Sequence, residues 1–176
     1  MAGDLGPLAP LTNRLVTYVW VKRILDLPLL RDVVSPLIGL ILFRPRIDWH
    51  KLKSMVRGRV AVVFGAGPSL ASGLARLKGI LAKYRGALLL ACADGAVKAL
   101  LEQGVTPDIV VSDLDGDPTA LSRAYREGSV FVILCHGDNV GRQLLMRRYV
   151  RRVFMTSQVY LLPPLIWCTG GFTDGD

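Results

Sequence analysis

Glutamate is nearly absent from this 176-residue chain, which contains twelve aspartates but only two glutamates, Glu102 and Glu127. Exposed helices favour Glu, whereas Asp is more often a turn or capping residue, because its short side chain bonds to the nearby backbone. Eight of the twelve aspartates lie between Asp94 and Asp176. The acidic side chains are therefore concentrated in one part of the chain, where short carboxylates in turns suit metal binding or capping.

Cysteine is also scarce. Cys92, Cys135 and Cys168 are widely spaced and form no CxxC pair, which favours reduced thiols in a buried sheet over a catalytic role and fits a cytoplasmic location. The N-terminus lacks the basic start, apolar stretch and small-residue cleavage site of a signal peptide. The apolar run 33–43 is too short to span a bilayer and contains Pro36, so we expect a packed helical or interfacial segment there and no membrane partner.

Stacking aromatics are missing from the most basic segment. The net charge of +8 suits nucleic acid, a membrane surface or a small polyanionic substrate. Five arginines lie between Arg142 and Arg152, but nucleic-acid surfaces interleave aromatic side chains with basic ones, and this segment offers only Tyr149. We therefore expect a solvated helix face leading into a strand, and no specific nucleic-acid partner.

Two regions of the chain differ in texture. Residues 1–57 mix apolar clusters with five prolines, which break helices, so we expect a short helical N-terminal segment made of small pieces. Residues 58–176 alternate apolar runs with helical stretches, which predicts an α/β domain with a doubly wound, mostly parallel, Rossmann-like sheet. The apolar runs do not alternate with polar residues, as expected for strands buried on both faces. The expected strands are 59–64, 86–92, 108–112, 129–135 and 152–156, and the expected helices are 69–84, 96–103, 118–126 and 139–149.

Polar motifs follow the ends of the first four expected strands. They read GAGPS, ADGA, SDLDGD and HGDN in chain order. Ligands of such sheets bind beyond the carboxyl ends of the strands. The placement of these motifs therefore predicts one binding site at that edge.

The third motif lies in the stretch 107–117, PDIVVSDLDGD, where a strand opens into a turn with Asp113, Asp115 and Asp117 at alternate positions. Carboxylates this close repel one another unless a cation lies among them. The turn thus predicts a bound metal ion.

A second acidic turn, GGFTDGD at 170–176, adds Asp174 and Asp176. Mg²⁺ is usually held by one or two carboxylates together with substrate phosphates. Two Asp-rich turns at strand ends therefore predict a magnesium and polyphosphate site.

The GAGPS turn joins a strand to a helix. Gly65 and Gly67 let a phosphate approach the backbone, and the helix start supplies N–H donors. The dinucleotide fingerprint would need glycine where Leu70 stands, and the Walker pattern needs a Gly-Lys pair that is missing, so neither motif applies. A tight turn with Pro68 in the first helical turn and a Ser69 cap is the structural alternative.

Asp94 and the HGDN motif have structural explanations as well. Asp94, Asp138 and Asn139 are all able to cap a following helix, and a lone histidine is more often a structural hydrogen-bonding residue than a ligand. At the carboxyl edge, the functional alternatives are that Asp94 accepts a hydrogen bond from a ligand, that His136 donates to a phosphate oxygen, and that Asp138 joins the metal shell.

These motifs, in this order, are similar to those of the MptE-like family of archaeal 6-hydroxymethyl-7,8-dihydropterin diphosphokinases. The resemblance rests on GAGPSL at 65–70, ADGA at 93–96, PDIVVSDLDG at 107–116, HGDN at 136–139, TSQ at 156–158 and GGFTDGD at 170–176. It covers the chain from about Arg59 onward. The related thiamin pyrophosphokinases share the ADGA, PD and paired-Asp elements, but their later acidic turn differs.

The resemblance implies a thiamin pyrophosphokinase-like catalytic domain that transfers diphosphate from ATP to 6-hydroxymethyl-7,8-dihydropterin with Mg²⁺, releases AMP, and serves folate or methanopterin biosynthesis. It implies metal ligands at Asp113, Asp115, Asp174 and Asp176, catalytic roles for Asp113, Asp115, His136 and Asp138, and binding of ATP or substrate by Gly65, Gly67, Pro68, Ser69, Asp94, Asn139, Gln158 and Thr173.

Two departures from the family pattern stand out. The family usually reads HAHGDN, and Leu134 replaces the first histidine here. The family motif also continues past the second acidic turn with an arginine, a strand and a helix, whereas this chain stops at Asp176. We therefore expect the catalytic domain to be incomplete at its C-terminus.

Other functions stay open on the sequence alone. A thiamin diphosphokinase would perform the same transfer on another acceptor. A nucleotide-binding or sugar-transfer accessory module and a basic RNA-binding α/β domain represent other classes, but neither needs both acidic turns. Whether the chain forms a homo-oligomer is also open.

Overall fold

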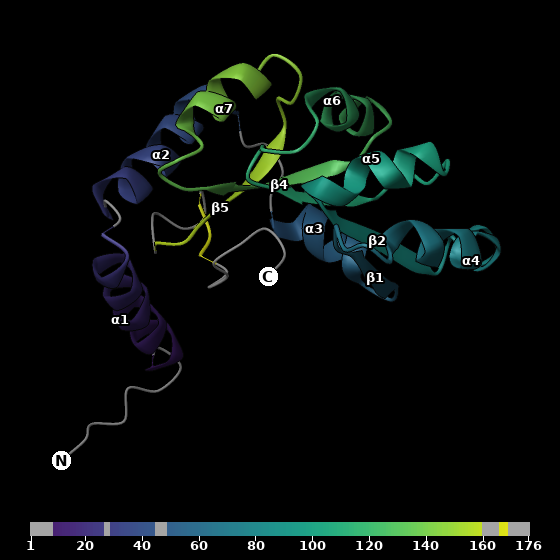
Figure 1. Cartoon of the computed structure of the whole chain (residues 1–176), viewed down its shortest axis with the longest axis horizontal. Coiled ribbons are helices and arrows are strands. Elements are labelled where there is room, and N and C mark those ends of the chain that lie inside the picture. The colour runs from purple at the N-terminus through teal and green to yellow at the C-terminus, as the bar shows by residue number, and fades with distance from the viewer. Residues whose placement is uncertain (1–8, 27–28, 45–48, 160–165, 169–176) are drawn as a thin grey trace.

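The structure, a computed structural model of the chain, describes residues 9–26, 29–44, 49–159 and 166–168. One five-stranded sheet forms its centre (Figure 1), with strand order β1-β2-β3-β4-β5 and every neighbouring pair parallel. The strands are β1 (Val60–Phe64), β2 (Leu88–Ala93), β3 (Ile109–Ser112), β4 (Val130–Cys135) and β5 (Val153–Ser157). The helices are α1 (Ala9–Ile24), α2 (Leu29–Leu42), α3 (Trp49–Val56), α4 (Leu70–Lys83), α5 (Asp94–Glu102), α6 (Pro118–Arg126) and α7 (Val140–Met146).

The predicted α/β fold with a parallel sheet and a helical N-terminal segment is confirmed. All five expected strands and the four expected helices after residue 58 are present, within a few residues of their expected bounds. The main difference is α7, which ends at Met146 and not at Tyr149. Arg147 to Arg152 therefore lie in the connection to β5, and the prediction that this segment is a helix face was wrong.

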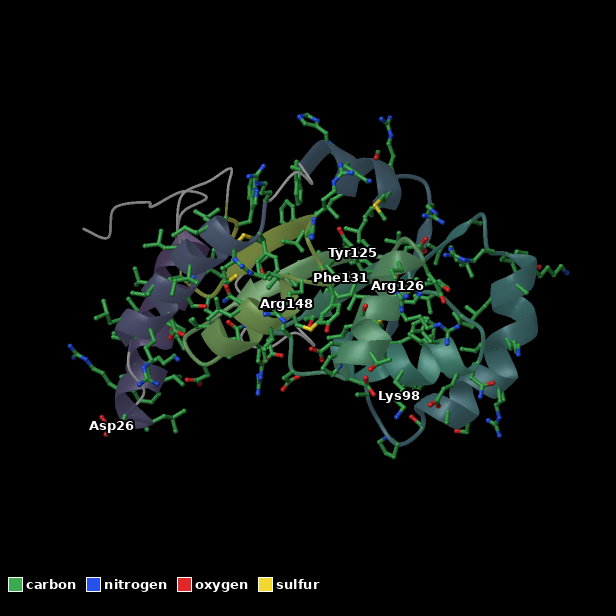
Figure 2. The ribbon with its side chains drawn as sticks, turned by 90° about the horizontal axis from the view of Figure 1, so that it is seen from above. Asp26, Lys98, Tyr125, Arg126, Phe131 and Arg148 are labelled. Atoms are coloured by element: carbon green, nitrogen blue, oxygen red, sulfur yellow. The ribbon has the colours of Figure 1, made fainter. Side chains whose placement is uncertain are left out.

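Consecutive strands are neighbours throughout the described sheet, so all four crossovers run in the same direction. A right-handed crossover then places α4, α5, α6 and α7 on the same face, where α2 joins them over β4 and β5. The core on this face contains Leu90, Val110, Phe131 and Met155. Tyr125 of α6 meets Phe131 edge-on, with ring centroids 5.9 Å apart (Figure 2).

The opposite face of the sheet is covered by α3. Leu52 of α3 packs with residues of β2 to β5, including Leu89 and Phe154. Trp49 stacks on Trp167 with ring centroids 5.3 Å apart. Strands β2 to β5 are thus covered on both faces, which explains why their sequences do not alternate with polar residues.

Strand β1 departs from that expectation. It pairs only with β2, and its Val60 and Val63 are 65% and 72% exposed. Its continuous apolar sequence had predicted burial on both faces, and this prediction was wrong. The cluster that Leu52 of α3 forms on that face contains residues of β2 to β5 and none of β1, so α3 leaves β1 uncovered.

The N-terminal helices are longer than the prolines suggested. Pro36 lies inside α2 and does not end it. The apolar run 33–43 is indeed a packed helix, since Phe43 is fully buried and a side chain at Gly39 would meet Met155 of β5. Helix α2 packs on β4 and β5, so the N-terminal segment contacts the α/β domain. The domain boundary between residues 57 and 58 stays a prediction. Within the described residues, no helix is long and apolar enough to cross a membrane.

The cysteines are free in the described structure. Cys92 and Cys135 are buried in β2 and β4, whereas Cys168 is only partly buried. Burial raises the pKa of the Cys92 and Cys135 thiols to about 12. Neither thiol is therefore ionised at neutral pH, which argues against a nucleophilic role.

Candidate functional site

Three carboxylates converge at the carboxyl edge of the sheet. Asp94 follows β2, and Asp113 and Asp115 lie in the turn after β3. One carboxylate oxygen from each residue lies within 4.8 Å of the other two. Hard oxygen donors at this spacing suit a divalent cation of the magnesium type.

Asp94 reaches this group by a different route from the one expected. The residue at the N-cap of α5 is Ala93, and the Asp94 carboxylate makes no capping bond. It accepts hydrogen bonds from Ser112 Oγ at 2.7 Å and from the Gly116 N–H at 3.3 Å. The capping explanation for Asp94 was therefore wrong, and its carboxylate instead ties the end of β2 to the acidic turn.

The acidic turn is held in an unusual backbone conformation. Leu114 has a φ of 71°. A residue with a Cβ rarely adopts this left-handed conformation, which costs on the order of 1–3 kcal/mol. Burial of the Leu114 side chain in the core and a 2.8 Å hydrogen bond from its N–H to Ser112 Oγ offset that strain. The backbone of the acidic turn lies close to the backbone of Asp94 at Gly116. A Cβ at this position would lie only 3.2 Å from the Asp94 backbone oxygen, so glycine permits the contact.

His136 is bonded to the acidic turn. Its Nε2 lies 3.1 Å from Asp113 Oδ2, and the Asp138 N–H donates to its Nδ1 at 3.4 Å. Because Nδ1 accepts, the proton of the neutral ring is on Nε2, which donates to Asp113. The hydrogen bond from His136 holds the pKa of the Asp113 carboxyl below its usual value, although partial burial opposes this. Asp113 is therefore ionised at neutral pH.

Arg142 is a site residue that the sequence did not reveal. Its Nη1 lies 3.7 Å from both Asp113 Oδ2 and Asp115 Oδ2, so one guanidinium partly neutralises both carboxylates. The sequence had grouped Arg142 with the basic segment. The available signal was its position three residues after Asn139, in the first turn of α7, which directs it back toward the HGDN loop.

Asn139 occupies the interior and does not cap α7 through its side chain. Its Nδ2 donates to the Leu134 carbonyl at 2.6 Å and to the Asp113 carbonyl at 3.0 Å. Its Oδ1 accepts from Ser35 and from Gln143. With its amide engaged by these partners and no exposed surface, Asn139 positions the two loops, and its contact with a ligand stays a prediction.

The N-terminal helices support the HGDN loop. Buried Asp32 of α2 accepts a hydrogen bond from the Gly137 N–H at 2.5 Å, and Lys22 Nζ lies 2.6 Å from Asp32. Tyr18 also donates to Asp32. Burial alone would raise the pKa of the Asp32 carboxyl, but the hydrogen bonds from Lys22 and Tyr18 lower it below its usual value. The helical segment therefore fixes the backbone that carries His136.

The GAGPS turn lies open at the same edge. Gly65, Gly67 and Ser69 line a cavity of about 350 Å³ beside α4. A Cβ at either glycine would meet nothing within 4 Å. Ser69 occupies the N-cap of α4, as the structural alternative had it, but its hydroxyl makes no capping bond. The turn has room for a ligand group against its backbone.

The remaining predicted residues fall in several places. Asp117 caps α6 by accepting from the Thr119 and Ala120 N–H groups at 2.8 and 3.1 Å. Asp138 is exposed and is not among the three converging carboxylates. Gln158 follows β5 and is partly buried. Pro68 lies exposed in the GAGPS turn, and Thr173, Asp174 and Asp176 lie outside the described residues.

Comparison with known proteins gives a consistent result. The family described as 6-hydroxymethylpterin diphosphokinase MptE-like matches residues 44–176. Three archaeal proteins named 6-hydroxymethyl-7,8-dihydropterin pyrophosphokinase are similar to the chain. The protein of Methanocaldococcus jannaschii is 40% identical over 138 residues, which cover 74% of this chain and 55% of that protein. Those of Methanothermobacter thermautotrophicus and Pyrococcus furiosus are 41% and 40% identical, over 65% and 72% of this chain and 47% and 51% of theirs. The chain thus spans about half the length of these relatives.

The support of the HGDN loop by Asp32 can be tested through stability. We expect Lys22→Met to lower the free energy of unfolding at pH 7 by about 3 kcal/mol, because it leaves a buried carboxylate without its cation. Adding Asp32→Asn should restore part of that loss, since an amide still accepts from Gly137 without a charge. Chemical denaturation at several pH values measures both effects.

The pH dependence follows from the lowered pKa of Asp32. Its contribution to stability is full above the carboxyl pKa of the unfolded chain and is lost as the pH falls through the lower folded pKa. The difference between wild type and Lys22→Met should therefore shrink in acid. A pH-independent difference, or no rescue in the double variant, would contradict the assignment of a buried ion pair.

Proposed function

The chain belongs to the 6-hydroxymethylpterin diphosphokinase MptE-like family, and we propose that it transfers diphosphate from ATP to 6-hydroxymethyl-7,8-dihydropterin with Mg²⁺ and releases AMP. The observation that carries this proposal is the convergence of Asp94, Asp113 and Asp115, whose ligand atoms lie within 4.8 Å of one another. Transfer of this kind depends mostly on positioning and on neutralising phosphate charge.

The carboxylate group fits a magnesium ion. Its donors are all oxygens, and Asp113 is kept ionised by the hydrogen bond from His136. Asp94, Asp113 and Asp115 would hold the ion, and bound Mg²⁺ would supply positive charge that neutralises the phosphate charge developing during transfer. Asp174 and Asp176 are further proposed ligands from the second acidic turn.

Two groups of the chain are suited to the phosphates. The open backbone at Gly65 and Gly67 leads into α4, whose first N–H groups and positive dipole end attract anions. Arg142 lies between this acidic site and solvent, with a side chain 44% exposed, and its planar guanidinium matches phosphate geometry. We propose that Arg142 turns from the carboxylates to phosphate oxygens when ATP binds. His136 would then hold Asp113 in place through Nε2.

An enzyme is favoured over a binding module for one structural reason. Nucleotide binding by the GAGPS turn alone would not require three carboxylates to converge or an arginine to balance them. The metal and phosphate groups do not distinguish the acceptor, because a thiamin diphosphokinase would need the same ones. The three similar proteins are all named for the pterin substrate, which supports the pterin.

The acceptor is tested by AMP release from ATP. We expect the full-length protein to form AMP and a pterin diphosphate with 6-hydroxymethyl-7,8-dihydropterin, and to form little AMP with thiamin. The reaction should stop when EDTA removes Mg²⁺ and resume when Mg²⁺ is restored. Faster turnover with thiamin would identify thiamin, and not the pterin, as the acceptor. AMP formation in the absence of any acceptor would contradict diphosphate transfer.

The metal role predicts a contrast among three aspartates of one turn. Asp113→Asn and Asp115→Asn should each lower kcat by about a hundredfold or more, because an amide replaces a charged ligand at the same volume. Asp117→Asn is the matched control, since Asp117 caps α6 and asparagine caps a helix about as well, so the melting temperature should change little and kcat should stay within about twofold. Equal losses in all three variants would point to a general defect of the turn.

The phosphate role of the GAGPS turn predicts a selective loss of ATP affinity. Gly67→Val should weaken ATP binding about tenfold, the worth of roughly one lost charge-assisted hydrogen bond, because the side chain would occupy the space that phosphate needs. The fold should tolerate this change, since a Cβ at Gly67 meets nothing within 4 Å, and the same is true of the control Gly79→Val on α4. Calorimetry with ATP and with the pterin separates the effects. Unchanged ATP affinity in a folded Gly67→Val protein would make the turn purely structural.

A further inference from the structure

Five arginines from two separate segments of the chain line one cavity. The cavity has a volume of about 560 Å³. Its lining combines the end of α2 with the connection between α7 and β5. The lining residues are Leu42, Arg44, Arg147, Arg148, Arg151 and Arg152; Arg148 is labelled in Figure 2.

This arginine cavity lies at the opposite edge of the sheet from the candidate active site. All five strands are parallel, so their amino ends share one edge and their carboxyl ends the other. Arg151 and Arg152 immediately precede β5 and therefore lie at the amino edge. The acidic turn and His136 follow β3 and β4 and lie at the carboxyl edge. An anion bound in the cavity would thus occupy a second site.

The arginines have no counter-charge within the described part of the chain. None of the five guanidinium groups makes an ion pair or a hydrogen bond with a described residue, whereas Arg85 and Arg123 each meet a carboxylate at 2.9 Å or less. Arginines at the end of α7 would be favoured by the helix dipole. That effect accounts for Arg147 and Arg148 but not for Arg44, Arg151 or Arg152. All five arginines are exposed, so water screens part of the repulsion among them, and an anion bound in the cavity would remove more of it.

We propose that the arginine cavity binds a small anion that carries two or more phosphate groups. Guanidinium groups bind phosphate oxygens in pairs, and several of them around one cavity match several phosphates. The volume falls in the range of small-molecule sites. A nucleic acid is less well matched, because the lining contains no aromatic side chain on which a base would stack.

Calorimetry with inorganic tripolyphosphate, in the absence of Mg²⁺, tests this site on the full chain. We expect saturable binding that Arg148→Gln/Arg151→Gln weakens about tenfold or more, because two guanidinium groups are lost from the lining. The matched control is Arg76→Gln/Lys78→Gln, which removes the same charge from the exposed surface of α4 and should change the affinity by less than about twofold. Gly67→Val should leave this binding unchanged, which separates the cavity from the GAGPS turn.

Several results would overturn the proposal. Equal weakening in the two double variants would mean that only net charge matters, and unchanged affinity in Arg148→Gln/Arg151→Gln would place the anion elsewhere. Single-stranded RNA that binds more tightly with length, and loses this in the double variant, would make the occupant a nucleic acid. In the same way, vesicles of anionic lipid that bind the wild type but not the double variant would make the occupant a membrane surface. Should the double variant fail to fold, Arg44→Gln on the α2 side replaces it, and a smaller but clear loss of tripolyphosphate binding is expected because one guanidinium group is removed from the lining.

Discussion

The buried side-chain amide of Asn139 is the interaction on which the candidate active site depends. It joins the end of β4, the acidic turn after β3, α2 and α7 through the Leu134 carbonyl, the Asp113 carbonyl, Ser35 and Gln143. A buried amide that loses one of these partners pays the cost of an unsatisfied polar group, so the four elements keep one arrangement. The positions of Asp113 and His136, and through them the metal site, follow from this network.

The same arrangement separates charge along the molecule. At the carboxyl edge of the sheet, Asp94, Asp113 and Asp115 gather beside Arg142, which partly balances their charge, and beside His136, which donates a hydrogen bond to Asp113. At the amino edge, the arginine cavity has no such balance among the described residues. Helices α2 and α7 connect the two edges, because each begins beside the HGDN loop and ends beside the cavity. The net charge of +8 therefore understates how sharply the two signs are divided.

The sequence predicted the elements well because most of the sheet is covered on both faces. A continuous apolar run is buried on both faces when it forms an inner strand of a sheet covered by helices. Strands that alternate with helices form such a sheet with parallel strands. The failures have a common cause as well. Strand β1 looked like its neighbours but lies outside the cluster that covers them on the α3 face, and Asp94 and Ser69 looked like helix caps but their side chains make no capping bond. Coverage of a strand and capping by a side chain depend on neighbours in space, which a local pattern does not contain.

By itself the sequence determined that the polar motifs share one edge of a parallel sheet, because strand direction and motif order leave no other place for them. It also determined that Asp113 and Asp115 lie in one turn. Only the tertiary structure decided that Asp94 joins them, that Arg142 balances them, and that Asn139 and Asp32 are buried supports. Those contacts join residues 18 to 105 positions apart, and their distances are set by how helices and strands pack. Packing is a property of the whole fold, so no single motif could predict them.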